Sequence, residues 1–259
     1  MDLLALEYWY VFPVAVAVAF VANASGFSGA VLFQPFFNFV LQVPIAQSIA
    51  TGIATETIGM TSGAGRYVLM RKVDGRALLV LLPPVLMGVA LGLFFFARAP
   101  RDWLRLTVGL VVGGIALYQL GLACRGHFGL RPHADLTELA RHRWRALLSG
   151  AFSACTGTGV AEMTQPLLEH RGGLATKRSN ATAIAIEAVA DWGITLVNLS
   201  LGNLRADILV FSVSGVLIGA QLGALSSPRL PDRLLKTTFA VCVLGIALVY
   251  VVTGLRRLL

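Results

Sequence analysis

The sequence predicts an all-α integral membrane protein built from two inverted-topology repeats. Hydrophobic residues make up 56% of the 259 residues and charged residues only 13%, whereas about a quarter of the residues in a soluble domain are charged. Several apolar stretches reach the roughly 20 residues that cross a bilayer, and the two halves of the chain match each other. A soluble protein of this size cannot keep so much apolar surface from water, so the solvent must be lipid.

Charged residues and cysteines give no sign of a nucleic-acid or metal partner. The formal charge is +8, but Lys and Arg lie in short segments between apolar stretches, where they set membrane topology. Cys124, Cys155 and Cys242 lack C-x-x-C spacing, so neither a zinc site nor a disulfide framework is predicted. No cofactor is predicted either. The N-terminal segment carries Asp2 and Glu7 without a basic region, which favours a retained helix over a cleaved signal.

Ten apolar stretches follow one another along the chain in two sets of five. An arginine-rich polar segment at 123–145 separates the sets. We therefore expect a first transmembrane repeat at 1–122, a cytoplasmic connector at 123–145 and a second repeat at 146–259. The stretches on either side of 25–28 and 156–162 are too short to span the hydrocarbon core. The ten stretches lie at 9–24, 29–42, 46–70, 77–97, 103–122, 146–160, 163–169, 180–201, 206–226 and 236–255.

The second set repeats the first at a constant displacement of 131 residues. Chance matches of Leu and Val are common in apolar sequences, but paired Pro, Gln and Glu residues in one register are not. This internal repeat indicates a duplicated unit. The matched residues are Gly26 with Gly157, Gln34-Pro35 with Gln165-Pro166, Ala50-Thr51 with Ala181-Thr182, Glu56 with Glu187, Gly88-x-x-x-Gly92 with Gly219-x-x-x-Gly223, and Pro100 with Pro231.

The basic residues distinguish two arrangements of the repeats. If the interrupted first segment of each copy crosses the membrane, the copies are parallel and the 21 Lys and Arg residues divide 12 against 9. If that segment is a re-entrant hairpin, each copy is a broken helix pair plus three transmembrane helices, about eight membrane segments by conventional counting, and 15 basic residues share one side. Only this inverted arrangement obeys the positive-inside rule, although the parallel one stays open. The inverted arrangement puts both termini on the non-cytoplasmic side of a bacterial cytoplasmic (inner) membrane.

The interrupted helices are the expected substrate site. Irregular backbone survives at membrane depth only where it is buried in protein or lines a cavity, and inverted-repeat transporters bind substrate where such half-helices meet. Hydroxyl groups and the freed N–H groups at a half-helix start suit an anion. The alternative is that the small residues only allow close helix packing, as expected for the GxxxG pairs. The candidate substrate-binding residues are Ser25, Gly26, Ser28, Gly29, Gln34, Thr51, Thr156, Gly157, Thr158, Gly159, Gln165 and Thr182.

Four acidic residues within the apolar stretches are candidates for proton coupling. Glu56 and Glu187 occupy matching positions, where a charge costs several kcal/mol unless it is paired, hydrated or protonated. Asp191 lies one turn after Glu187, on the same helix face, and Glu162 follows the second break. The first copy has Met60 and Val31 at the equivalent positions, so the coupling can be asymmetric. Two alternatives stay open, namely hydrogen bonds that hold the bundle together and direct contact with the substrate.

The twice-occurring broken helix resembles the signature of the TauE/SafE sulfite exporter family, in which a G-x-G-G-G run precedes a proline and an A-x-x-T-type helix. The resemblance covers nearly the whole chain. Asp74 after Arg71-Lys72 also resembles the family's short charged link. The matching segments are Gly26-Phe27-Ser28-Gly29-Ala30 with Pro35 and Ala50-Thr51, and Gly157-Thr158-Gly159-Val160-Ala161 with Pro166 and Ala181-Thr182.

The resemblance implies transport of sulfite, of sulfonates such as sulfoacetate, or of related organosulfur anions, with export a common direction. Both glycine runs are thinned in this chain, to Ser28 and Ala30 in one copy and to Val160 and Ala161 in the other. These changes narrow the cavity or alter its donors, so they affect the choice of substrate. The expected partners are thus a small anion, protons and the lipid bilayer, while the oligomeric state stays open.

The expected function is a proton-coupled secondary carrier that works by alternating access, and three other functions compete with it. A passive anion channel shares the pseudo-symmetric pore and lacks only the coupling. An intramembrane serine protease is a distant alternative, because Gly26-Phe27-Ser28-Gly29 resembles the rhomboid serine motif. Such a serine needs a base within hydrogen-bond reach, and the four histidines lie in polar segments. We therefore do not expect an enzyme. A scaffold role would make both breaks dispensable.

Overall fold

The computed structural model describes residues 6–96, 109–110, 113–114, 116–118, 120–121, 130–231, 237, 241, 244–245, 247–249 and 251–253. All regular elements among these residues are helices, apart from one isolated bridge between Arg131 and Leu174. Three helices are long and apolar enough to cross a membrane, at Gly75–Phe95, Thr176–Ser200 and Ala206–Arg229. The prediction of an all-α membrane protein is confirmed at this level.

Each helix of the first half has a counterpart of similar length in the second half. The two longest, α3 and α9, both have 25 residues. Each half also has a short helix that ends at a proline and passes into a π-helical turn. Proline lacks the backbone N–H that a regular α-helix would use at this position. The bounds are α1 Val11–Ser25, α2 Ala30–Pro35 with the π-helical turn Phe36–Val40, α3 Ile45–Leu69 and α4 Gly75–Phe96 in the first half, then α6 Leu136–Arg141, α7 Trp144–Thr156, α8 Val160–Pro166 with the π-helical turn Leu167–Arg171, α9 Thr176–Ser200 and α10 Ala206–Ser226. Single 3-10 turns lie at Leu6–Tyr8 and Ser227–Arg229.

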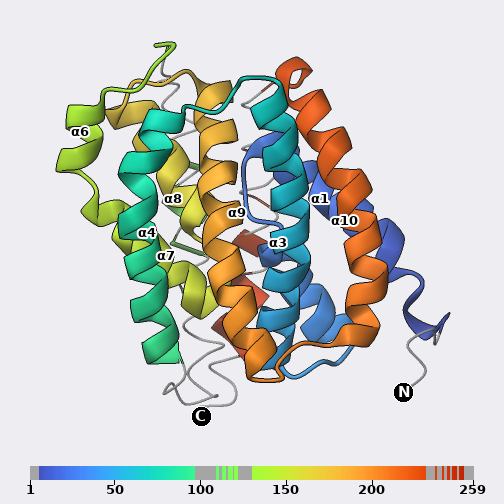
Figure 1. Cartoon of the computed structure of the whole chain (residues 1–259). Helices are drawn as coiled ribbons and strands as arrows, with labels where there is room; N and C mark the ends of the chain where they lie inside the picture. Colours follow the sequence, from blue (N-terminus) through green and yellow to red (C-terminus); the bar gives the residue numbers. More distant parts are fainter. Residues whose placement is uncertain are drawn as a thin grey trace.

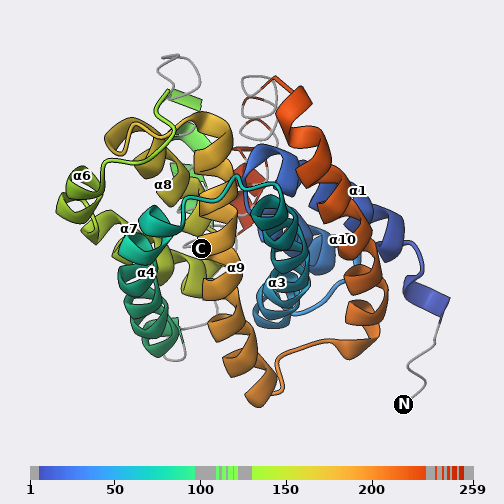
Figure 2. The same cartoon turned by 45° about the horizontal axis from the view of Figure 1, so that its top comes forward.

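The helices α3 and α9 lie side by side at the centre of the bundle (Figures 1 and 2). The colours in Figure 1 show that they run in opposite directions. Helix α4 packs on α9 and α7, whereas α10 packs on α3 and α1. The short helices α2 and α8 pack on α3 and α9, respectively. Each half of the chain therefore packs the first helix of its broken segment, α1 or α7, against a long helix of the other half, and the second, α2 or α8, against a long helix of its own half.

Glycines allow the closest helix contacts in the bundle. A Cβ atom added to Gly88 would meet the carbonyl oxygen of Leu147 in α7, and one added to Gly219 would meet that of Val16 in α1. Gly92 and Gly223 approach the same neighbouring helices one turn further on. Backbones come this close only where no side chain intervenes. The expected packing role of both GxxxG pairs is confirmed.

Substitution of Gly219 by alanine should separate α1 from α10. The new methyl group would overlap the carbonyl oxygen of Val16, and overpacking of this kind costs typically about 1–3 kcal/mol. We expect a lower unfolding temperature in detergent, measured by intrinsic fluorescence. Gly75→Ala is the matched control, because no atom lies within 4 Å of a Cβ added there. Equal unfolding temperatures for the two variants would contradict the packing role.

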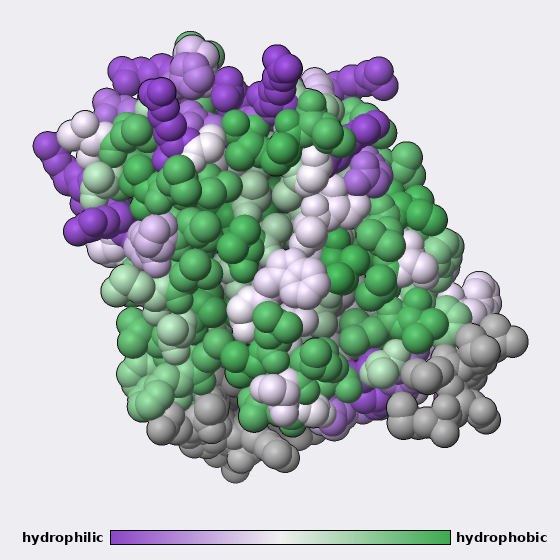
Figure 3. Space-filling model, in the orientation of Figure 1, coloured by the Kyte–Doolittle hydropathy of each residue, from purple (hydrophilic) through white to green (hydrophobic). Residues whose placement is uncertain are grey.

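Polar segments gather at one end of the bundle, at the top of Figure 3. They include the loop between α3 and α4, the loop before α6, the loop before α9 and the end of α10. The joining hydrogen bonds run from Asp74 N–H to Thr182 Oγ1 (2.9 Å), Ala134 N–H to Asp74 Oδ2 (3.1 Å), Arg131 N–H to the Gly173 carbonyl (2.9 Å) and Lys177 Nζ to the Ser227 carbonyl (2.6 Å). The described Lys and Arg residues within 66–76, 131–145 and 171–178, and at 229, therefore lie at the same end, as the inverted arrangement requires.

Asp74 holds this end together as a buried carboxylate at the start of α4. Burial acts to raise its pKa, but hydrogen bonds from the N–H groups of Ala134 and Ala77, with the charge of Arg178, lower the pKa below its ordinary value. The ionised form of Asp74 thus stabilises the folded chain. That stabilisation is present above the unfolded pKa of about 4 and is lost as the pH falls through the lower folded pKa.

We expect Asp74→Asn to lower the unfolding temperature at pH 7, with a difference from the wild type that narrows as the pH falls below about 4. Thermal unfolding in detergent over a pH series measures this. Asp135→Asn is the control, because Asp135 caps the short helix α6 with an exposed carboxylate and should have the smaller effect. A difference that stays the same at every pH would show that the Asp74 charge has no part in it.

Some sequence predictions fall outside the described residues. The expected spans at 103–122 and 236–255 lie largely outside them, as do Cys124, Cys242 and both chain ends. Cys155 is described, and its thiol lies 3.5 Å from the carbonyl oxygen of Gly92. The boundaries of the two repeats and the connector therefore stay predictions.

Candidate functional site

The two breaks form where α1 and α7 end on left-handed glycines. Gly26 has φ 80° and Gly157 has φ 72°, a conformation that side chains with a Cβ disfavour. The N–H groups of these glycines donate to Ala22 (2.8 Å) and Ser153 (2.7 Å), which closes both helices. The chain then turns back and starts α2 and α8. The sequence therefore places both breaks correctly, and the glycines are required by the backbone turn.

The hydroxyls of Ser25 and Thr156 close the same helix ends. Ser25 Oγ donates to the Val21 carbonyl (2.6 Å) and Thr156 Oγ1 to the Phe152 carbonyl (2.8 Å). Both side chains are buried. These two candidate residues therefore shape the breaks through their own helices.

Glu56 of α3 fills the start of α2. Its Oε1 accepts the N–H of Gly29 (2.5 Å), and its Oε2 accepts the hydroxyl of Ser28 (2.6 Å) and the N–H of Ala30 (3.1 Å). The side chain is only 3% exposed. Freed N–H groups at a helix start carry a positive partial charge and bind anions. The donors predicted for a substrate are therefore occupied by a carboxyl group of the protein itself.

Glu187 and Glu162 accept backbone N–H groups at the second break. The N–H of Ala161, the counterpart of Ala30, lies 3.5 Å from Glu187 Oε1. Glu162 accepts the N–H of Ser28 at Oε1 (2.7 Å) and the N–H of Gly159 at Oε2 (3.0 Å). One carboxyl group thus joins the first break to the second.

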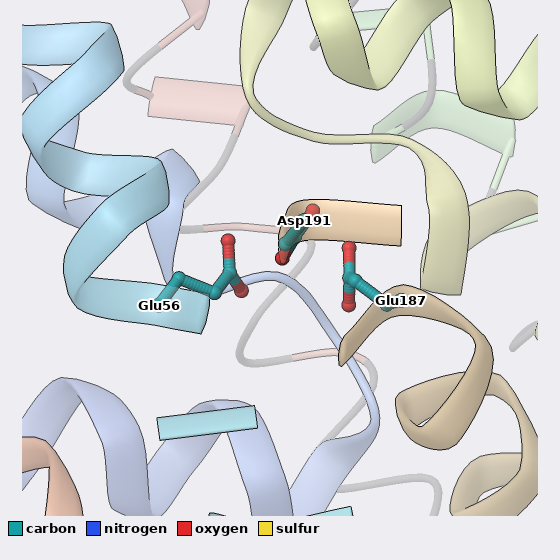
Figure 4. A group of neighbouring side chains, drawn as sticks. All are labelled: Glu56, Glu187 and Asp191. Carbon is teal, nitrogen blue, oxygen red and sulfur yellow. The ribbon is translucent and has the colours of Figure 1, made fainter. Parts of the chain in front are cut away.

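Three carboxyl groups meet between the two central helices. Oxygen atoms of Glu56, Glu187 and Asp191 lie within 4.8 Å of one another, and Figure 4 shows the three groups facing one another. All three residues are buried, and Glu187 Oε2 and Asp191 Oδ2 have no hydrogen-bond partner among the described residues. No described Lys, Arg or His forms an ion pair with these three residues. The cluster therefore needs protons or another donor to offset its charge.

The same cluster is the one described group that offers three ligands for a metal. Oxygen ligands suit hard cations such as Ca²⁺ and Mg²⁺. Both oxygens of Glu56, however, already accept backbone N–H groups. The starts of α2 and α8 also bring positive partial charge to this place, which disfavours a cation. The arrangement suits protons better than a metal ion.

The remaining candidate residues divide between the breaks and other places. Gln34 Nε2 donates to the Thr156 carbonyl (2.7 Å) and so joins the two breaks. Thr158 and Gln165 are buried, and the carbonyl oxygen of Gln165 has no hydrogen-bond partner in the described part of the chain.

The hydroxyls of Thr51 and Thr182 accept hydrogen bonds from outside the breaks. Thr51 Oγ1 accepts the N–H of Arg205 at the start of α10 (3.1 Å), and Thr182 Oγ1 accepts the N–H of Asp74 at the start of α4 (2.9 Å). These two contacts are counterparts, because Asp74 and Arg205 also differ by the repeat displacement. The two threonines hold the helix starts of the opposite half, and their part in substrate binding stays a prediction.

Asn180, Asn23 and Tyr67 support the first break but were not predicted from the sequence. Asn180 Nδ2 donates to the Ala24 carbonyl (3.3 Å), and its Oδ1 is the atom that a Cβ on Gly26 would meet. Tyr67 donates to the Asn23 carbonyl (2.7 Å). The sequence signal for Asn180 was a polar amide inside an apolar stretch. The internal repeat did not point to it, because the matching residue of the first copy is the apolar Ile49.

The family comparison agrees with this geometry. The family model described as Sulfite exporter TauE/SafE matches residues 11–250. The chain belongs to this family. The predicted resemblance to TauE/SafE proteins is therefore confirmed over nearly the whole chain, including both breaks and all four buried acidic residues. No curated protein and no solved structure matches the chain. Membership of TauE/SafE and the long apolar helices make it a multi-pass membrane protein of a transporter family.

Proposed function

We propose that the chain is a secondary carrier for a small sulfur-containing anion such as sulfite or a sulfonate, coupled to protons. In this proposal two inverted repeats rock around a site at the membrane midplane, where the two breaks meet. The antiparallel directions of α3 and α9 support the inversion, as does the exchange of neighbours between halves, with α1 on α10 and α7 on α4. Family membership supports the class of cargo.

The occupied helix starts are the observation that carries this proposal. The N–H groups of Gly29 and Ala30 and the hydroxyl of Ser28 point at one carboxyl group, that of Glu56. A site that binds a carboxylate through such donors also binds other oxyanions of similar size. The substrate contacts that we propose are therefore at Ser28, Gly29, Thr158 and Gly159, with Gln34 and Gln165 at the edge.

Competition for these donors would couple the anion to protons. A protonated carboxyl accepts hydrogen bonds more weakly than a carboxylate, because charge-assisted bonds are about twice as strong as neutral ones. Protonation of Glu56 or Glu187 would then release the helix start to the incoming anion. Asp191 and Glu162 would share the protons within the same buried group. Anion and proton would bind together, so a gradient of either could drive the other.

The basic residues at the polar end of the bundle support one membrane orientation. Twelve described Lys and Arg residues belong to the segments gathered there, and Arg205 is the one described at the opposite end. Under the positive-inside rule the polar end faces the cytoplasm. The first break segment would then enter and leave from the non-cytoplasmic side as a re-entrant hairpin, an assignment supported by the contact between the rings of Tyr10 and Phe36 (6.4 Å). The second would enter and leave from the cytoplasmic side, because the segments before α6 and before α9 are hydrogen-bonded to each other at the polar end. This orientation puts the termini on the non-cytoplasmic side of a bacterial inner membrane.

The alternative functions have less support from the site. A passive channel does not need carboxyl groups on the donors of both half-helices. For a protease, the hydroxyl of Ser28 would need a base. The carboxyl group to which it donates, that of Glu56, already accepts the N–H groups of Gly29 and Ala30, which make it a weaker base. The described histidines His133 and His170 are exposed, and His142 lies beside Glu138 in α6.

Flux measurements in proteoliposomes test the proposed function. We expect the purified chain to carry sulfite or a sulfonate across the membrane faster with an imposed pH gradient than without one. Acetate and chloride serve as comparison anions, and a pH-sensitive dye inside the vesicles follows the protons. Flux that ignores the pH gradient would favour the passive channel. No flux of any sulfur-containing anion would refute the proposal.

A further inference from the structure

Glu162 lies where a substrate oxyanion would bridge the two breaks. Its Oε1 accepts the N–H of Ser28 in the first break at 2.7 Å, and its Oε2 accepts the N–H of Gly159 in the second at 3.0 Å. The side chain is 1% exposed. The two donors thus come from opposite halves of the chain and converge on the two oxygens of one carboxyl group. We propose that the N–H groups of Ser28 and Gly159 form a cradle for the substrate. The carboxylate of Glu162 fills this cradle as a built-in oxyanion, and a transported oxyanion displaces it.

The chemistry of the cradle specifies its ligand. Each of its two N–H donors needs its own oxygen, and the two oxygens must be bonded to one central atom, as in a carboxylate, a sulfite or a sulfonate. A single-atom anion such as chloride cannot present two separate oxygens to Ser28 and Gly159. The proposed ligand class is therefore small oxyanions. This assignment rests on the proposed transport function and adds the residue that competes with the substrate.

Only the second half of the chain supplies this competitor. The equivalent position of the first half is Val31, which is buried and apolar. Glu162 also caps its own helix, because Gly159 lies at the start of α8. Its second contact, with Ser28, is a bond between the two halves. A displaced Glu162 would therefore both free the cradle and release this link, which is what rocking of the two halves requires.

Unpartnered acidic oxygens next to the cradle favour a ligand that carries a proton. Glu187 Oε2 and Asp191 Oδ2 are buried without a described hydrogen-bond partner. They join the cradle through Glu56, which binds the hydroxyl of Ser28. Buried polar atoms are rarely left unsatisfied. A small oxyanion with an acidic O–H, such as hydrogen sulfite, offers oxygens to the two N–H groups and a donor to these oxygens.

Replacement of Glu162 by alanine provides the direct test. The variant should unfold at a lower temperature in detergent, because two buried N–H groups lose their acceptor. Formate, sulfite or methanesulfonate should restore the unfolding temperature by filling the vacated cradle, and chloride should not. Glu169→Ala is the matched control: Glu169 is also buried, but it accepts the hydroxyl of Thr176 (2.6 Å) and lies in the π-helical turn after α8. Oxyanions should not restore this control.

A second variant covers the case in which Glu162→Ala does not fold. Glu162→Gln keeps the size of the side chain but removes the charge that competes with the substrate. We expect sulfite to bind Glu162→Gln about 10-fold more tightly than the wild type, the equivalent of one charge-assisted hydrogen bond. Isothermal titration or thermal shift measures the difference.

The possible results separate this inference from the proposed function. Equal restoration of Glu162→Ala by chloride and by formate, or equal sulfite affinity of Glu162→Gln and the wild type, would overturn the cradle while sulfite flux by the wild type still supported the carrier. Absence of sulfite or sulfonate flux in the wild type would instead refute the carrier. Restoration by oxyanions alone, together with tighter binding by Glu162→Gln, would support the cradle.

Discussion

Replacement of both Glu56 and Glu187 by glutamine should abolish proton-driven transport. Glutamine cannot release a proton, so neither helix start could be switched between carboxylate and substrate. Its amide group also places a second donor against the N–H groups that Glu56 accepts from Gly29 and Ala30. Each donor left without an acceptor costs about 1–3 kcal/mol. We therefore expect flux at the level of protein-free vesicles and a moderately lower unfolding temperature.

The control for this pair is Glu169→Gln, a buried glutamate in the π-helical turn after α8. It should keep its response to the pH gradient. Single variants add information, because the two halves are not equivalent: Glu187 has Asp191 one turn away, whereas Glu56 has Met60. Proton-driven flux is measured as sulfite uptake with and without a pH gradient. An unchanged gradient response in the double variant would exclude these two residues as the coupling groups.

Replacement of Gly26 or Gly157 by alanine should collapse the two breaks. Both glycines have a left-handed backbone, which costs other residues roughly 1–2 kcal/mol. A Cβ on Gly26 would also meet Asn180 Oδ1, and one on Gly157 would meet Gln34 Nε2. Displacement of a buried amide adds about 1–3 kcal/mol. Each variant should therefore lose several kcal/mol of stability and all transport, since the donors of α2 and α8 would move.

Gly65→Ala is the matched control for these substitutions. Gly65 lies within α3, and no atom lies within 4 Å of a Cβ added there. Alanine is favoured over glycine inside a helix by about 1 kcal/mol, so this variant should be as stable as the wild type or more so. Unfolding temperature and sulfite flux are measured on all three. If Gly26→Ala and Gly157→Ala matched Gly65→Ala in both measurements, the left-handed breaks would not be required for function.

The matched pairs in the sequence predict the centre of the candidate site. Glu56 with Glu187 and Gly26 with Gly157 share one displacement of 131 residues, as expected if a duplicated unit keeps equivalent positions in register. The structure brings all of them together, with Ser28, Gly159 and Glu162 between them. The position of Asp191 beside Glu187 followed from helix periodicity and is found in the cluster.

The sequence did not indicate which groups occupy the donors. It assigned the N–H groups of the breaks to the substrate and the acidic residues to protons, as two separate sets. In the structure the carboxyl groups of Glu56 and Glu162 sit on those N–H groups. It also grouped Thr51 and Thr182 with the breaks, whereas their hydroxyls bind backbone N–H groups of the other half. The contacts of Glu162 with Ser28 and of the two threonines join residues more than 100 positions apart, and that of Glu56 with Gly29 joins residues 27 positions apart. Local periodicity carries no information about such pairs.

The sequence by itself determined the membrane environment, the two broken helices and the buried acidic residues, and it predicts a duplicated unit. These follow from composition, from backbone requirements at glycine and from the high cost of charge in hydrocarbon, which act locally along the chain. Only the tertiary structure decided that α1 packs on α10 and α7 on α4, and that one glutamate bridges both breaks. The reason is physical: helix packing depends on the shapes of two surfaces, and a carboxyl group takes the nearest free N–H donors, whichever half of the chain supplies them.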